Sequence, residues 1–228
     1  FFVFSVYLKA ALRVSAIQNL PVTYVFTHDS IAVGEDGPTH EPIEHLASLR
    51  TIPNTYVFRP ADATEAQAAW YLSQKVNNKP TSLVLTRQNL PVLENTSFEK
   101  VSKGAYVVYE TSSDFDTILI ATGSEVALAV DVARELEKEG SKVRVVSMPS
   151  VELFEEQSKE YKEELLPRSV RRRVSLEMGN TALWYKYVGL DGLAIGIDNF
   201  GASAPANKAI EEYGFTVAKV VERIKNEL

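Results

Sequence analysis

Val22-Thr23-Tyr24-Val25-Phe26 is the first of three short runs that decide the fold class, and its β-branched and aromatic residues predict a strand. Residues 56–58 and 82–86 predict two further strands. Between the strands, the helical spacing of apolar residues predicts helices over residues 41–50 and 62–76. Strands that alternate with helices form parallel sheets joined by crossover helices. The chain is therefore predicted to begin with an α/β domain.

The alternation stops over residues 88–116, which contain Pro91, Gly104 and one strand at residues 105–109. It then resumes, with strands predicted at residues 117–121, 143–147, 174–176 and 193–195 and helices at residues 125–139, 206–213 and 216–226. We predict two three-layer α/β domains, each with a mostly parallel sheet flanked by helices. Residues 1–100 form the first and residues 101–228 the second, with residues 88–116 as the linker region.

Composition and charge exclude several classes of protein. The 228 residues are 45% hydrophobic and 24% charged, which is typical of a globular chain and not of a disordered one. The sequence has no cysteine, so it has neither disulfides nor thiolate metal sites, and this fits a cytoplasmic protein. A net charge of −6 argues against a nucleic-acid partner. No apolar run is long enough for a membrane helix, so we expect no membrane partner.

The first residues of the chain are unusually aromatic. The chain starts at Phe1 without an initiator methionine or a signal peptide, so we expect it to come from a longer protein through truncation, proteolysis or a split gene. Phe1, Phe4 and Tyr7 are spaced by three and would form one stripe on a helix. Such a stripe either packs in a core or stacks on a flat heteroaromatic ring.

The three histidines lie close together in the sequence, in and just after the loop that follows the first predicted strand. Ligands bind at this end of the strands in open parallel sheets, so His28 and His40 are candidate site residues. The alternative is that they only cap and hydrogen-bond the loop. His40 and His45 are five residues apart, which takes them off one helix face and argues against zinc. We predict no metal site in this chain and a structural role for His45.

Arginines occur in two places where an anion could bind, and the first is the stronger candidate. Arg87 directly follows the third predicted strand, where a guanidinium suits a bidentate grip on a phosphate or carboxylate. A surface arginine paired with an acid is the alternative. A second group lies in the acidic half of the chain and is interpreted as the solvated start of a strand: Arg168, Arg171, Arg172 and Arg173. The strand-to-helix junction at residues 121–125 lacks the lysine of a phosphate-binding loop.

Five segments, in order along nearly the whole chain, resemble the transketolase family. They are Thr27-His28-Asp29-Ser30 continuing through Pro42, Arg59-Pro60-Ala61-Asp62, Thr86-Arg87-Gln88-Asn89-Leu90-Pro91, Ala121-Thr122-Gly123-Ser124-Glu125, and residues 197–205. The resemblance implies an enzyme that moves a two-carbon ketol unit from a ketose phosphate to an aldose phosphate. It also implies thiamine diphosphate and Mg²⁺, or another divalent metal, as cofactors of the complete enzyme.

The same resemblance implies that this chain is incomplete. It is similar to the later part of the pyrimidine-binding domain followed by the C-terminal domain. The family's diphosphate-binding domain, with its metal motif, and the glutamate that activates the cofactor are missing. Because the family builds each site between two subunits, the implied partners are sugar phosphates, a second subunit of a homodimer and the missing domain. We therefore expect the fragment alone to be inactive.

Carried over by position, the aromatic residues are implied to bind the cofactor. Phe1, Phe4 and Tyr7 match the pocket around its pyrimidine ring, where stacking contributes about 0.5–1.5 kcal/mol per aromatic pair beyond area burial. Val6 departs from the polar or acidic residue that the family usually has at this position.

Four further residues are implied to bind substrate, two of them as catalytic groups. His40 matches the histidine beside the reacting end of the cofactor, and His28 and Arg87 match groups that hold the sugar phosphate. Asp36 matches the acid that reads the configuration of the substrate's α-hydroxyl. Imidazoles pass protons near neutral pH, so His40 and His28 are the implied catalytic residues.

Two alternatives stay open at this point. A non-catalytic binding or regulatory module on the same fold would have no need for His28, Asp36, His40 and Arg87 together. A 2-oxoacid dehydrogenase beta-like chain should not carry the Thr-His-Asp-Ser and Arg-Gln-Asn-Leu signatures. The sequence immediately upstream of Phe1 would separate these alternatives from transketolase.

Overall fold

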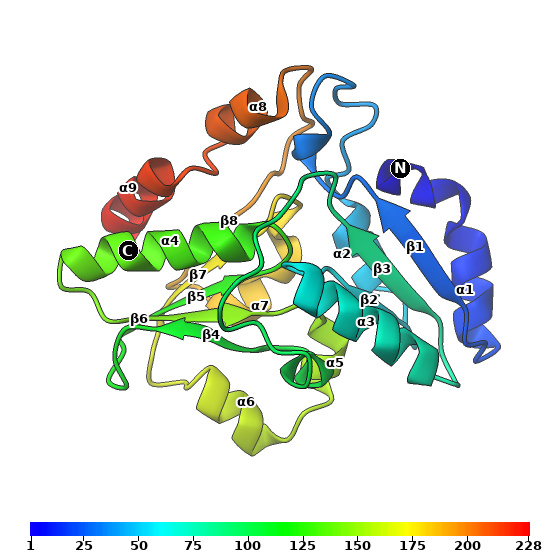
Figure 1. Cartoon of the computed structure of the whole chain (residues 1–228), viewed down its shortest axis with the longest axis horizontal. Helices are drawn as coiled ribbons and strands as arrows, with labels where there is room; N and C mark the ends of the chain where they lie inside the picture. Colours follow the sequence, from blue (N-terminus) through cyan, green and yellow to red (C-terminus); the bar gives the residue numbers. More distant parts are fainter.

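The computed structural model describes all 228 residues and shows two α/β sheet domains side by side (Figure 1). The N-terminal domain has three parallel strands in the order β1-β3-β2, namely β1 (Thr23–Thr27), β2 (Tyr56–Phe58) and β3 (Thr81–Leu85). The C-terminal domain has five strands in the order β4-β6-β5-β7-β8. These are β4 (Tyr106–Glu110), β5 (Thr117–Ala121), β6 (Val143–Ser147), β7 (Arg172–Leu176) and β8 (Leu193–Ile195).

Helices cover both faces of the first sheet. They are η1 (Phe2–Tyr7), α1 (Lys9–Ile17), η2 (Ile31–Val33), α2 (His45–Arg50) and α3 (Ala63–Lys75). One sheet face packs on η1, α1 and α2 through Phe26, Val57 and Val84, whereas the other packs on α3 through Phe58 and Leu83. The three-layer arrangement predicted from the sequence is therefore present.

The helix predicted from residue 41 begins later, at His45. Pro42 explains why Glu41 is excluded, because the ring of a proline disfavours the helical conformation at the residue before it. The loop after β1 is therefore longer than the periodicity predicts, and it keeps His40 outside the helix.

The C-terminal domain is also three-layered. Its helices are η3 (Lys100–Lys103), α4 (Glu125–Lys138), α5 (Val151–Glu155), α6 (Lys159–Leu165), η4 (Thr181–Leu183), α7 (Tyr185–Val188), α8 (Ala206–Glu212) and α9 (Val217–Glu227). Leu119 of β5 faces the apolar cluster that contains α4 and α9 residues, and Ile118 faces the cluster that contains α5 and α7 residues. Only β4 runs antiparallel, beside β6, so the sheet is mostly parallel as predicted.

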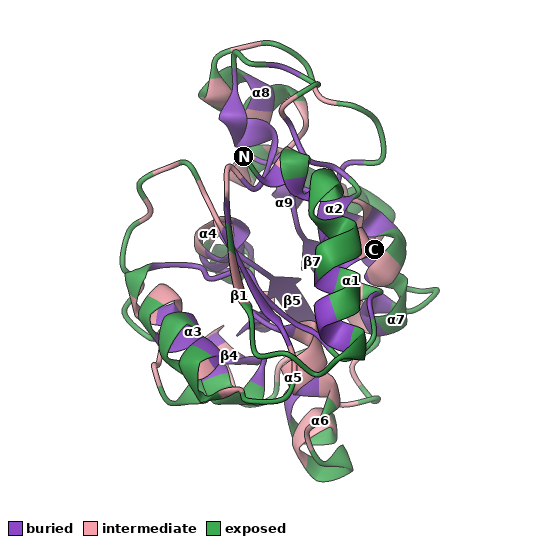
Figure 2. Cartoon of the chain, turned by 90° about the vertical axis from the view of Figure 1, so that its right-hand side faces the viewer, coloured by how far each residue is buried: buried purple, intermediate pink, exposed green.

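The two domains share one hydrophobic core. A cluster of 32 buried residues joins Phe58 and Leu83 of the first sheet to Tyr106 and Leu119 of the second. In Figure 2 the buried strand β5 is drawn in purple, whereas β1 is mostly half-buried and drawn in pink. The division near residue 100 stays a prediction, and the shared core favours unfolding of the two domains together. None of the helices combines the length and apolarity needed to cross a bilayer.

Candidate active site

Parallel pairing of β1 with β3 brings two candidate residues to one edge of the first sheet. Thr27 is in register with Leu85, so His28 and Arg87 follow neighbouring strand ends. His28 has a φ of 66°, in the left-handed region that non-glycine residues rarely adopt. Its Nδ1 lies 3.0 Å from the hydroxyl oxygen of Thr27. The strand end therefore presents His28 in a fixed and unusual backbone conformation.

The pKa of His28 is lowered, first by burial and then by the positive charges of the chain's N-terminus and of Arg87. The carboxylates of Asp36 and Asp29 oppose this effect. The imidazole therefore lies within electrostatic range of both Arg87 and Asp36, and its neutral form is favoured. A neutral imidazole has one nitrogen that donates and one that accepts a hydrogen bond.

Asp36 and Arg87 line the same hollow, which has a volume of about 310 Å³. The other lining residues are Val33, Gly34, Glu35, Pro205 and Ala206. A guanidinium and a carboxylate on one wall suit a ligand that carries both an anionic group and hydroxyl groups.

The aromatic stripe lies beside both histidines. The ring centroid of Phe1 is 4.1 Å from that of His28 and 5.5 Å from that of His40, and the Phe4 and His40 centroids are 5.3 Å apart. Phe1, Phe4 and Tyr7 remain 46%, 41% and 81% exposed, so they are not core residues. Phe2 is the buried residue of this segment. The segment is a 3₁₀ helix with three residues per turn, which is why every third side chain shares one face.

His45 does not lie against the aromatic stripe of Phe1, Phe4 and Tyr7. Its Nε2 lies 2.9 Å from the carbonyl oxygen of Val3, and burial lowers its pKa. His40 instead lies 2.9 Å, through Nδ1, from the hydroxyl oxygen of Thr39. The two histidines therefore have different partners, and His45 joins α2 to the first residues of the chain.

Comparison with known proteins decides the family. Residues 1–92 match the description "Transketolase, pyrimidine binding domain", and residues 104–216 match "Transketolase-like TK C-terminal domain". This chain belongs to the transketolase family. It is 68% identical to a "Probable transketolase" of Streptococcus pneumoniae over 226 residues, which cover 99% of this chain and 34% of that protein. It is 58% identical to the transketolase of Bacillus subtilis over 99% of this chain and 34% of that protein.

Solved transketolases have the same fold. A Pichia stipitis transketolase in complex with sedoheptulose-7-phosphate has a TM-score of 0.94 and 45% identity over 100% of this chain and 33% of that one. A split-gene transketolase, described as an inactive beta4 tetramer, has a TM-score of 0.82 and 25% identity over 100% of this chain and 74% of that one. This chain spans about a third of the length of the curated transketolases that it matches.

Sequence analysis missed the contribution of the transketolase C-terminal domain to this site. The Ser203 hydroxyl donates to the carbonyl of Glu35 at 2.6 Å, and α8 packs against η2. Gly34 has a φ of 89°, and a Cβ there would lie 3.2 Å from the backbone nitrogen of Ala206. Loop residues 28–40 and the segment before α8 therefore lie side by side (Figure 1). The stretch at residues 197–205 resembles transketolase, but the resemblance does not indicate that this stretch contacts the loop after β1.

Glu41 is a second residue that sequence reasoning left out. It is buried directly after His40, and burial raises its pKa to about 7, while the Ala202 backbone amide opposes the rise. A Cβ at Gly201 would lie 1.6 Å from the Oε2 atom of Glu41. Only glycine at position 201 leaves room for the carboxyl group of Glu41, which follows His40.

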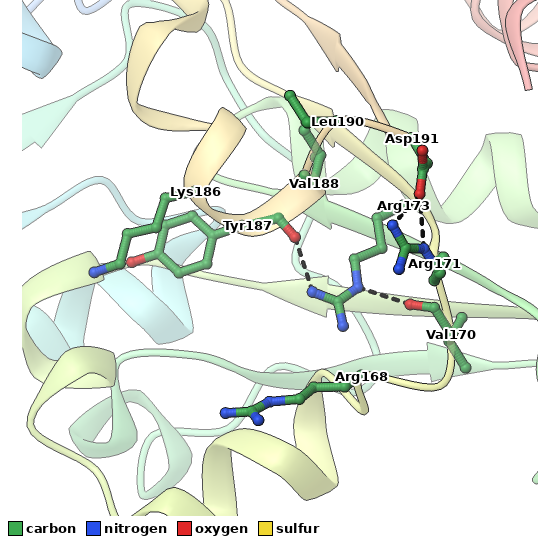
Figure 3. Close-up of a pocket in the computed structure, with 10 residues that line it drawn as sticks. Arg168, Val170, Arg171, Arg173, Lys186, Tyr187, Val188, Leu190 and Asp191 are labelled. Atoms are coloured by element: carbon green, nitrogen blue, oxygen red, sulfur yellow. Dashed lines mark hydrogen bonds and ion pairs between the residues drawn. The ribbon is translucent and has the colours of Figure 1, made fainter.

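Three arginines of the C-terminal group, Arg168, Arg171 and Arg173, line a hollow of about 290 Å³ (Figure 3). Arg173 donates to the carbonyls of Val170 and Tyr187 at 2.8 and 2.9 Å and also to those of residues 166 and 167. Arg171 is paired with Asp191, and Arg168 lies 3.4 Å from Glu163. These partners favour the interpretation of this group as the polar start of β7 over an anion site.

Proposed function

We propose that this chain supplies the pyrimidine-binding and substrate-binding part of a transketolase. The complete enzyme would transfer a two-carbon ketol unit from a ketose phosphate to an aldose phosphate. The observation that carries the proposal is the meeting, at one sheet edge, of an exposed aromatic stripe, two imidazoles and a hollow lined by Asp36 and Arg87. A non-catalytic module would need no such combination of groups.

Phe1, Phe4 and Tyr7 fit the flat pyrimidine ring of thiamine diphosphate. Their rings are exposed and share one face, and Phe4 and Tyr7 are stacked with an interplanar angle of 26°. Bound there, thiamine diphosphate supplies the carbon nucleophile that the side chains of this chain lack. The residues form no cluster of three or more potential metal ligands, so we assign Mg²⁺ to the diphosphate-binding part of the complete enzyme.

The substrate residues act in order along the sugar. His40 lies against the aromatic stripe and donates to the ketol oxygens, and Asp36 accepts from the α-hydroxyl. His28 and Arg87 hold the phosphate at the far end, where a guanidinium makes paired, charge-assisted hydrogen bonds. The neutral form of His28, favoured by burial and by Arg87, can donate one hydrogen bond without adding a further charge.

A second copy of the same chain is the proposed partner, in a cytoplasmic homodimer that also contains the diphosphate-binding domain. Exposed large apolar residues support this, because most of them fall in the first 25 residues, on η1, α1, β1 and the segments beside them. They are Phe1, Phe4, Val6, Tyr7, Leu8, Val14, Ile17, Leu20, Val22 and Val25. The green faces of α1 in Figure 2 mark part of this surface. Exposed apolar patches of this kind mark protein interfaces.

The 228 residues alone are expected to show no ketol transfer and to bind thiamine diphosphate weakly. The residues form no cluster of three or more potential metal ligands, so the diphosphate would lack a bound metal ion as its partner here. Titration calorimetry with thiamine diphosphate and MgCl₂ measures this. A chimera in which this chain replaces the corresponding third of the Streptococcus pneumoniae relative is the positive control. A dissociation constant in the low micromolar range for the isolated chain would contradict the expectation.

Arg87→Ala in the chimera is expected to lower kcat/KM for phosphorylated ketoses by about 10- to 150-fold. This corresponds to the loss of charge-assisted hydrogen bonds of about 1.5–3 kcal/mol. Much of the loss should appear in KM, because the phosphate is bound in both the ground state and the transition state. Unphosphorylated ketoses do not make this contact, so their kcat/KM should hardly change.

The matched control is Arg168→Ala, since the Arg168 side chain is 92% exposed and lies in the C-terminal domain. It should leave kcat/KM unchanged on both kinds of substrate. Thermal melting of both variants identifies any loss of folded protein. Equal losses on a ketose and its phosphate for Arg87→Ala would refute the phosphate assignment.

A further inference from the structure

His28 is connected to the C-terminal domain through a buried arginine. Arg59 follows β2 directly and is fully buried. Its Nε donates to Asp29 Oδ2 at 2.8 Å, and its Nη1 donates to the Thr122 carbonyl and hydroxyl oxygens at 3.0 and 2.9 Å. Both of its terminal nitrogens also donate to the carboxylate of Glu125. One guanidinium therefore joins the residue next to His28 to the turn between β5 and α4.

Backbone contacts hold Arg59 in the same position. Its N–H donates to the carbonyl of Pro149 at 2.9 Å, and its carbonyl accepts from the N–H of Gly123 at 3.0 Å. Gly123 has a φ of 55°, and a Cβ there would lie 2.7 Å from the guanidinium carbon of Arg59. The turn at residues 122–125 therefore packs closely on this side chain, and a larger residue than glycine at position 123 would contact the guanidinium.

The other end of the linkage fixes the backbone of the site. Asp29 is buried, and its neighbour His28 has the left-handed backbone conformation described above. Such a conformation is unfavourable for histidine and persists only where the surroundings determine it. The Asp29–Arg59 ion pair is a charged contact made directly after this residue. Farther along the loop, Ser203 donates to the carbonyl of Glu35. The C-terminal domain therefore contacts the loop directly at Glu35 and is connected to Asp29 through Arg59.

We propose that the C-terminal domain positions His28 for the sugar phosphate through the linkage Glu125 and Thr122 to Arg59 to Asp29. This inference rests on the proposed function in assigning His28 to the substrate. Glu125, Thr122, Arg59 and Asp29 are then positioning residues, which act through the backbone of His28 without touching the substrate. The C-terminal domain thereby acquires a role in substrate binding even though its strands lie in the other sheet.

The first arm of the test uses the 228-residue chain and needs no activity. Histidine ring signals are recorded by NMR, and that of His28 is assigned by its loss in His28→Gln. Glu125→Gln keeps the shape of the side chain and removes its charge. Thr122→Val removes the hydroxyl that accepts from Arg59 and donates to Glu177. Each is expected to move the His28 signal and leave that of His45 in place. An unmoved His28 signal in both variants would overturn the inference.

The matched control for stability is Leu136→Ala, a cavity-forming change in the buried face of α4 that makes no contact with this linkage. It should lower the melting temperature while leaving the His28 signal where it is. A His28 signal that moves equally in Leu136→Ala would show that general loosening is responsible, which would also overturn the inference.

The second arm uses the chimera with a phosphorylated ketose. Glu125→Gln is expected to raise KM roughly tenfold with little change in kcat, because a displaced His28 weakens a contact made in both ground and transition states. In a His28→Gln background the same change should have no further effect on KM, since residues that act through one another are not additive. Additive effects on KM would overturn the positioning role. If His28→Gln leaves KM unchanged by itself, the proposed function fails, and the NMR arm still decides whether the linkage positions His28.

Discussion

Arg59→Met is expected to lower the free energy of unfolding of the 228-residue chain by about 3–5 kcal/mol. Removing one partner of a buried ion pair costs this much because the other charge is left without compensation in a medium of low dielectric constant. Here two carboxylates lose their partner, those of Asp29 and Glu125. Burial already raises the pKa of Glu125, and the charge of Arg59 is the largest opposing effect. Unfolding in guanidinium chloride, followed by circular dichroism, measures this change in the free energy of unfolding.

Two further variants test the cause. Arg134→Met removes an arginine of the exposed surface of α4, which is paired with Asp131 at 3.2 Å, and should leave the stability nearly unchanged. Adding Asp29→Asn and Glu125→Gln to Arg59→Met removes the uncompensated charges and should restore part of the loss. If the triple variant is no more stable than Arg59→Met, the loss comes from packing and the electrostatic explanation is wrong.

Glu65→Gln is expected to make the chain more stable by about 3 kcal/mol at pH 7.5 and to have little effect near pH 4. Burial raises the pKa of Glu65 from 4.5 to about 7, and its hydrogen bonds to Ser147, Ala61 and Tyr106 only partly oppose the rise. The folded state therefore favours the protonated acid. Its contribution is most favourable below pH 4.5 and is lost as the pH rises to about 7, and this difference in pKa corresponds to about 3 kcal/mol.

Glutamine suits this position because the hydroxyls of Tyr106 and Ser147, which now donate to Oε1, can rotate and accept from an amide. The Ala61 N–H, which donates to Oε2 at 2.7 Å, keeps a carbonyl acceptor. The matched control is Glu137→Gln, because Glu137 also accepts from a tyrosine hydroxyl but is exposed. Urea unfolding between pH 4 and 8 should give parallel curves for wild type and Glu137→Gln. A wild-type curve parallel to that of Glu65→Gln would mean that Glu65 does not titrate as described.

Local patterns in the sequence were enough to predict the layers and the adjacency of two site residues. Alternating strands and helices specify parallel pairing, and parallel pairing places the residues after β1 and β3 together, which is why His28 and Arg87 are neighbours. The direction of β4 could not be read in this way, since a strand pattern does not state its orientation. Pro42 did carry a local signal, and it explains why Glu41 lies outside α2.

The contacts between the domains could not be predicted, for a physical reason. Arg59 and Glu125 are 66 residues apart, and Ser203 is 168 residues from Glu35. Hydrophobic periodicity reports only on neighbouring residues, so it cannot predict either pairing. Arg59 stood out only as part of a motif shared with transketolases. Its burial becomes understandable only when both sheets are assembled, because its partners come from the turn after β5, from α4 and from the loop after β1.

The buried linkage also limits which substitutions this chain can accept during evolution. Asp29, Arg59 and Glu125 are encoded in separate parts of the gene, yet a charge lost at Arg59 leaves both carboxylates without a partner. Substitutions at these positions are therefore expected to covary among related sequences. Recombination that joins this N-terminal domain to the C-terminal domain of a distant relative should yield folded protein only where the incoming gene encodes a turn shaped like residues 122–125, with glycine at position 123.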